Sequence, residues 1–104
     1  MYISPARYDP FGLLPLQAAL HGCALLLSDI PSYREVWDGA ACFFRANDAV
    51  SLRERWRELL ASPARLGAIQ SECRERALTR YTPASMLDKY RALYAAAAQE
   101  WIAA

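Results

Sequence analysis

Residues 2–27 of the 104-residue chain read YISPARYDPFGLLPLQAALHGCALLL. Two short apolar runs, at residues 2–4 and 24–27, flank a segment that favours helix at residues 13–21. The loop at residues 5–12 is rich in turn formers, and Gly22 stops the helix. The second run is continuous, as in a strand buried on both faces, although periodicity alone does not separate it from a buried helix. The stretch predicts a strand that begins before the chain, a loop, a helix and a second strand.

A second helix and a third strand continue this alternation. Ser32 and Glu35 have the Ser-x-x-Glu spacing of a capping box, which predicts a short helix that ends near Asp38. Residues 41–44, Ala-Cys-Phe-Phe, predict a third strand. The order strand, helix, strand, helix, strand is the signature of a parallel sheet with right-handed crossovers. The expected fold class is therefore α/β, a partial Rossmann-like arrangement of three parallel strands followed by a helical C-terminal region.

Only helices are predicted in residues 47–104. Asp48 is a candidate N-cap, and the helix after it would carry apolar residues on one face: Leu52, Trp56, Leu59 and Leu60. Ser62-Pro63 and Thr82-Pro83 then open two further helices. We expect a single domain over residues 1–104, with the alternation and its loop in residues 1–46 and the C-terminal helices in residues 47–104.

Composition and charge exclude several classes of protein. A formal net charge of +1 argues against a nucleic-acid binder, because such domains concentrate basic residues on one surface. Arginine and glutamate alternate in the helical half, with pairs such as Glu72 and Arg76 four residues apart, which is typical of solvated helix faces. No apolar run approaches the ~20 residues that cross a bilayer, and we recognise no signal peptide. We therefore expect neither a nucleic-acid partner nor a transmembrane segment.

The cysteines and the single histidine do not predict a metal site. Cys23, Cys42 and Cys73 lack metal-ligand spacing, and His21 is the only histidine. We interpret the three cysteines as buried, reduced thiols of a cytosolic protein. His21 is interpreted as a helix-end residue rather than a catalytic base.

The junction between the first strand and the first helix is a candidate anion site. Unpaired amides at a helix N-terminus point outward, and the helix dipole favours negative charge there. Gly12 would let a phosphate approach the backbone closely. Ligands of open parallel sheets bind beyond the carboxyl ends of the strands, where this junction lies. Many such junctions bind nothing, so this signal alone does not establish a site.

A longer string around the junction resembles a known donor-site motif. Residues 4–18, SPARYDPFGLLPLQA, are similar to the PS-x-x-E-x-FG-x-x-x-x-E-A string of GT-B glycosyltransferases, especially the retaining enzymes of family 4. The continuation in that family, G-x-P-V-V-x-S-D followed by E-V, is matched here by Gly22, Ser28-Asp29 and Glu35-Val36. The resemblance covers nearly the whole chain and implies the last part of a C-terminal, nucleotide-sugar-binding domain.

The resemblance also implies roles for individual residues. Asp9 and Phe11 would contact the donor sugar, and Gln17 would contact the ribose. Backbone amides around Gly12, Leu13 and Leu14 would receive the diphosphate. No cofactor or metal would be needed, because the helix N-terminus and basic side chains take the charge that a metal would otherwise neutralise. The donor would be a nucleotide-diphosphate sugar.

Two positions depart from the family pattern, which has glutamate at both. Asp9 keeps the charge but is one methylene shorter. Gln17 replaces a carboxylate, which can accept from two hydroxyls at once, by an amide with a single acceptor oxygen. The loss of such a bond weakens affinity by about 1–2 kcal/mol. Arg7 is interpreted as solvent-facing. For Glu35 we prefer the role of a capping residue to that of a ligand-binding residue.

These observations favour the donor-binding portion of an enzyme that transfers a sugar from a nucleotide-diphosphate sugar to a glycan or lipid acceptor. The expected partners are the nucleotide sugar and an N-terminal acceptor domain, or the full-length parent, without which the isolated chain would be inactive. The expected location is cytoplasmic, with the parent enzyme at the inner membrane surface as one option. The alternative is a non-catalytic nucleotide-binding or assembly module that acts through an exposed sheet edge, as a homodimer through the first strand. A third interpretation is an unrelated small α/β nucleotide-binding domain.

Overall fold

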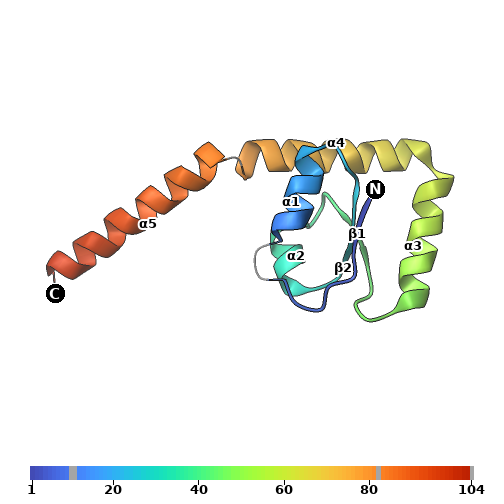
Figure 1. The fold of residues 1–104 in the computed structure, drawn as a ribbon, viewed down its shortest axis with the longest axis horizontal. Helices are drawn as coiled ribbons and strands as arrows, with labels where there is room; N and C mark the ends of the chain where they lie inside the picture. Colours follow the sequence, from blue (N-terminus) through green and yellow to red (C-terminus); the bar gives the residue numbers. More distant parts are fainter. Residues whose placement is uncertain (10–11, 82, 104) are drawn as a thin grey trace.

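The computed structural model describes residues 1–9, 12–81 and 83–103, and it confirms the α/β fold. Strands and helices alternate through the first 44 residues, and helices follow them (Figure 1). The elements are β1 (Tyr2–Ser4), α1 (Leu13–Leu20), β2 (Leu25–Ser28), α2 (Pro31–Trp37), β3 (Cys42–Phe44), α3 (Ala49–Ala61), α4 (Pro63–Arg80) and α5 (Pro83–Ala103). The fold is a partial Rossmann-like arrangement.

The three strands form one parallel sheet in the order β1-β2-β3. Tyr2 lies opposite Leu25 in the first pair, and Leu26 lies opposite Cys42 in the second. All four residues of β2 are buried, because a helix layer covers each face of the central strand. The expected strand buried on both faces is therefore confirmed, one residue later in the sequence.

The side chains of β2 divide the core into two clusters. Leu25 and Leu27 pack with residues from α1, α2 and α4, among them Tyr33 and Trp37. Leu26 points to the opposite face, since successive side chains of a strand alternate, and packs with Leu59 of α3. Figure 1 shows α1 and α2 on one side of the strands and α3 on the other.

The first helix ends as its sequence predicts. Gly22 has φ 84°, in the left-handed region. Its amide donates to the Ala19 carbonyl, and the Cys23 amide donates to the Ala18 carbonyl. These two bonds form a Schellman motif, which satisfies carbonyls that the end of the helix would leave unpaired.

The predicted capping box of α2 is wrong. The helix begins at Pro31, its N-cap residue is Ile30, and no side chain caps it. Proline favours the first helical position, because its fixed φ suits the helix and its missing amide would have no partner there. Ser32 therefore lies inside the first turn, where it cannot serve as the N-cap, and Glu35 has no capping role.

In α3 the predicted cap is confirmed, but the predicted apolar face is only partly buried. Asp48 accepts a hydrogen bond from the Ser51 amide, at 3.0 Å. Leu59 is fully buried, whereas Trp56 is 44% exposed and Leu60 is 63% exposed. The sheet is narrow, so it covers only the Leu59 side of this helix.

Glu72 on α4 is exposed, as expected of a solvated helix face, whereas Arg76 is only partly exposed and does not pair with it. Arg76 instead donates to the backbone carbonyls of Val36 and Asp38 at the end of α2. The last carbonyls of a helix have no partner within it, so a nearby arginine is a favourable donor. This contact joins α4 to α2, while α5 leads away from the sheet beyond α4 (Figure 1).

Two neighbouring leucines of α3 test this description of the core. Leu59→Ala should lower the free energy of unfolding by roughly 2–5 kcal/mol, because it leaves a cavity between α3 and the sheet. Leu60→Ala is the matched control: it makes the same change in the same helix at an exposed position, and should stay within about 0.5 kcal/mol. Urea unfolding curves of the two variants measure the difference. Equal losses would contradict the placement of Leu59.

Candidate functional site

The candidate site lies at the carboxyl ends of the strands. β1, β2 and β3 end at one edge because they are parallel, and the loop at residues 5–9 leaves from that edge. The Ser28 hydroxyl donates to the Ala6 carbonyl, and the Asp29 amide donates to the Phe44 carbonyl at 2.8 Å. The loop is therefore tied to the central strand before it reaches α1.

The N-terminus of α1 presents backbone amides at this edge. Gly12 is the N-cap residue, with φ 58° and ψ 40°, a conformation that favours glycine. No side chain caps the helix. The amides of Leu13 and Leu14 belong to the first turn, which has no intrahelical acceptors for them, and Pro15 has no amide. The helix start is thus a local positive end with two amides for a ligand.

Asp9 closes the loop in front of this helix. One carboxylate oxygen, Oδ1, accepts a hydrogen bond from the Gly12 amide at 2.9 Å. The other, Oδ2, accepts a hydrogen bond from the Tyr33 hydroxyl at 2.8 Å. Both oxygens of the side chain predicted to bind the sugar are therefore engaged within the protein, and each keeps further acceptor capacity.

Tyr33 is the residue that the sequence did not single out. It lies on α2, is 1% exposed, and its hydroxyl also lies 2.7 Å from the buried Ser4 hydroxyl. A carboxylate can only accept, so Tyr33 donates to Asp9 and accepts from Ser4. A Cβ added to Gly12 would lie 3.5 Å from the Tyr33 ring, which shows how closely the ring underlies the loop. A lone tyrosine in a short helix gives no sequence signal for this role.

The other predicted site residues are placed as follows. Gln17 is exposed on α1, four residues after Leu13 and hence one turn further along the same face. The side chains of Leu13 and Leu14 are 57% and 64% exposed. Phe11 lies outside the described residues. The structure thus gathers Asp9, Gly12 and the first amides of α1 at one point, with Gln17 one turn away.

Two charged groups lie at the same edge of the sheet, after β1 and after β2. Arg7 is exposed, as expected, and donates to the side-chain oxygen of Asn47 at 2.8 Å. That contact lies beside a hollow of about 310 Å³ between the loop and the start of α3. Arg34 donates two hydrogen bonds to Asp29, of 2.7 and 3.0 Å. These bonds hold the pKa of Asp29 below its usual value and offset its negative charge.

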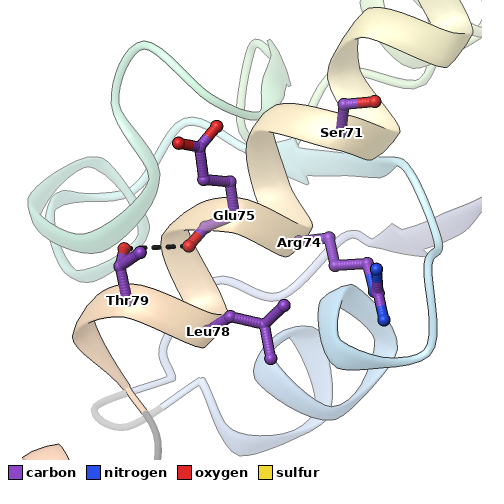
Figure 2. Close-up of a pocket in the computed structure, with 5 residues that line it drawn as sticks. All are labelled: Ser71, Arg74, Glu75, Leu78 and Thr79. Atoms are coloured by element: carbon purple, nitrogen blue, oxygen red, sulfur yellow. Dashed lines mark hydrogen bonds between the residues drawn. The ribbon is translucent and has the colours of Figure 1, made fainter.

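A second hollow, of about 340 Å³, lies away from this edge. Figure 2 shows that its walls come from α4 alone: Ser71, Arg74, Glu75, Leu78 and Thr79. The Thr79 hydroxyl donates to the Glu75 carbonyl, as a helix-surface threonine often does. In Figure 1, α4 crosses the end of the sheet opposite the loop, so this hollow is separate from the candidate site.

Within residues 1–9, 12–81 and 83–103, no group of three or more His, Cys, Asp or Glu side chains could hold a metal ion. No helix in the same ranges has the length and hydropathy to cross a bilayer. The three cysteines are free thiols, with Cys42 and Cys73 buried and Cys23 partly exposed.

Known proteins share this fold. One solved structure that the chain resembles is the sucrose-phosphate synthase of Thermosynechococcus elongatus, with a TM-score of 0.76 and 25% sequence identity. The match covers 90% of this chain and 25% of the synthase, so the chain spans about a quarter of that protein's length. No protein-family model and no curated protein sequence matches the chain. The chain therefore has a glycosyltransferase-like fold.

The burial of Tyr33 and its contact with Asp9 predict a loss of stability at alkaline pH. Burial, with the adjacent Asp9 carboxylate, raises the pKa of Tyr33 from 10.0 to about 12. The folded chain holds this proton more tightly than the unfolded chain, so the stabilisation is complete below pH ~10 and is lost as the pH rises through about 12. The difference in unfolding free energy between wild type and Tyr33→Phe should shrink over that window. A difference independent of pH, measured by urea titration, would contradict the contact.

Proposed function

We propose that the chain is the donor-binding portion of a glycosyltransferase that takes a sugar from a nucleotide-diphosphate sugar. The observation that carries the proposal is the start of α1. Gly12, in a left-handed conformation, opens a helix whose first amides face the carboxyl edge of a parallel sheet. Ligands of such sheets bind at this edge, and the overall fold is glycosyltransferase-like.

In this proposal the diphosphate binds at the amides of Leu13 and Leu14. A helix N-terminus carries a partial positive charge of about half a unit, which suits a phosphate oxygen. Arg7 is exposed on the adjoining loop and adds a positive charge that a small rotation could bring to the ligand. A metal ion is not needed to neutralise the diphosphate in this arrangement.

Asp9 and Gln17 would hold the two ends of the donor. The free lone pairs of the Asp9 carboxylate can accept from sugar hydroxyls while its inner bonds fix the loop. Gln17 is one turn along α1 and would meet the ribose. Its amide oxygen accepts from one hydroxyl, so the ribose is bound less strongly than it would be by a glutamate.

The transfer step requires an acceptor surface that lies outside this proposed donor site. The acceptor would be a glycan or a lipid, bound by a further domain, and the isolated chain would not turn over. The match to only a quarter of the synthase is consistent with a larger working enzyme. The free thiols of Cys42 and Cys73 fit a reducing compartment and support a cytoplasmic location.

Nucleotides should stabilise the chain if the proposal is correct. We would measure the melting temperature with UDP, GDP and ADP and with UDP-glucose, GDP-mannose and ADP-glucose. A ligand at ~100 times its dissociation constant stabilises the folded state by about 2.7 kcal/mol, which shifts the melting temperature of a chain this short by many degrees. A shift with one base would identify the donor class. No shift with any of the six would overturn the proposal.

A substitution at Gln17 sharpens this test. Gln17→Glu restores a carboxylate and should tighten nucleotide binding roughly tenfold, because a charge-assisted bond to the ribose is regained. Gln99→Glu is the matched control, since it makes the same change at an exposed position of α5. If the two variants bind the nucleotide with equal affinity, Gln17 does not contact the ribose.

A second candidate function, assembly, is favoured by the free edge of β1. The Tyr2 amide donates to the carbonyl of Ala24, the residue just before β2, so the backbone groups of Ile3, the next residue, point away from the sheet. No other strand in the described residues pairs with that edge. Unpaired edges recruit strands of other chains, and a two-fold dimer would pair two copies of β1 antiparallel.

This dimer predicts a concentration-dependent change at one amide. The Ile3 amide should exchange with solvent more slowly as the protein concentration rises, and sedimentation velocity should show a dimer over the same range. The Tyr2 amide, already bonded within the sheet, is the internal control. A monomer at every concentration, with fast exchange at Ile3, would rule out assembly through β1.

A further inference from the structure

We propose that Tyr33 is a positioning residue for the sugar end of the donor site: it sets the direction of the Asp9 carboxylate. The inference rests on the proposed function and adds a residue from outside the loop. Tyr33 lies on α2, 24 positions after Asp9 in the sequence, and its hydroxyl reaches Asp9 from beneath the loop.

The geometry fixes the carboxylate in two directions. The Gly12 amide binds Oδ1 at 2.9 Å, which alone would let the carboxylate turn about that bond. The Tyr33 hydroxyl binds Oδ2 at 2.8 Å and removes this freedom. Each carboxylate oxygen of Asp9 has one hydrogen bond within the protein and keeps further acceptor capacity for a ligand.

Tyr33 is itself held in one orientation. Its ring is in the core, with 1% exposure, and belongs to the larger core cluster together with Trp37. The Ser4 hydroxyl donates to the Tyr33 oxygen at 2.7 Å from the last position of β1. The orientation of Asp9 is therefore set by the sheet and by α2 as well as by the Gly12 amide. A site supported by a rigid outer layer of contacts keeps its geometry when the ligand arrives.

Two variants separate positioning from simple support of the fold. Tyr33→Phe keeps the ring in the core but removes the bonds to Ser4 and to Asp9. Ser4→Ala is the matched control, because it breaks the same buried hydrogen bond from the other end and leaves the Tyr33–Asp9 bond intact. Both should lower stability, since each deletes a buried hydrogen bond. Only Tyr33→Phe releases Asp9.

The readout is the affinity for a nucleotide sugar relative to the affinity for the same nucleotide without the sugar. Calorimetry with UDP and UDP-glucose, GDP and GDP-mannose, and ADP and ADP-glucose gives this ratio for each variant. We expect Tyr33→Phe to reduce the ratio about tenfold, the size of one charged hydrogen bond, and Ser4→Ala to leave it unchanged. A structural role alone would change both ratios equally, and that result would overturn the inference.

A double-mutant cycle tests whether Tyr33 acts through Asp9. Asp9→Asn should lower the ratio by itself, and Tyr33→Phe should then have no further effect. Additive losses would show that Tyr33 acts by another route and would overturn the inference. Failure of the proposed function gives a different result: wild type would bind none of the six ligands. If the chain binds the nucleotides but no attached sugar raises the affinity, the nucleotide site is supported and the positioning role of Tyr33 is rejected.

Discussion

The burial of β2 on both faces is the constraint on which the rest of the molecule depends. Leu25, Leu26 and Leu27 have no exposed surface, and burying each contributes roughly 1.5–3 kcal/mol. Because their side chains alternate, both faces of the sheet must be covered, by α1 and α2 on one side and α3 on the other. The strands are parallel and each is followed by a helix, so the strand ends and the starts of α1, α2 and α3 lie at one edge of the sheet. The candidate site occupies that edge as a consequence.

Local sequence signals predicted the elements whose causes are themselves local. The continuous apolar run predicted β2, Gly22 predicted the end of α1, and Asp48 predicted the cap of α3. Sequence patterns whose outcome depends on tertiary packing did not predict the contacts that form. Glu72 and Arg76 have ideal spacing for a helix pair, but Arg76 finds unpaired carbonyls on α2 instead. Likewise, helical periodicity predicts that Trp56 and Leu59 lie on one face of α3. It does not predict the width of the sheet, which decides how much of that face is buried.

The candidate site divides in the same way. The start of α1 could be predicted because a glycine before a helix is a local feature, and the family resemblance named Asp9, Leu13, Leu14 and Gln17. Tyr33 could not be predicted. Its contacts with Asp9 and Ser4 join residues 24 and 29 positions apart, and they exist only once α2 packs on the sheet. A tyrosine at that position is indistinguishable in sequence from any other core aromatic.

The two departures from the donor motif have different physical meanings. The short side chain of Asp9 accepts a hydrogen bond from the Gly12 amide, three residues later in the chain, as aspartate often does in turns. In the proposed site the carboxylate therefore stabilises the loop and also binds the ligand. Asp9 thereby gains rigidity and loses reach. Gln17 has no such compensation, because it is exposed and lacks both the charge and the second acceptor oxygen of a glutamate. In the proposed site, the sugar end is held by a fixed carboxylate, while the ribose end is the weaker half.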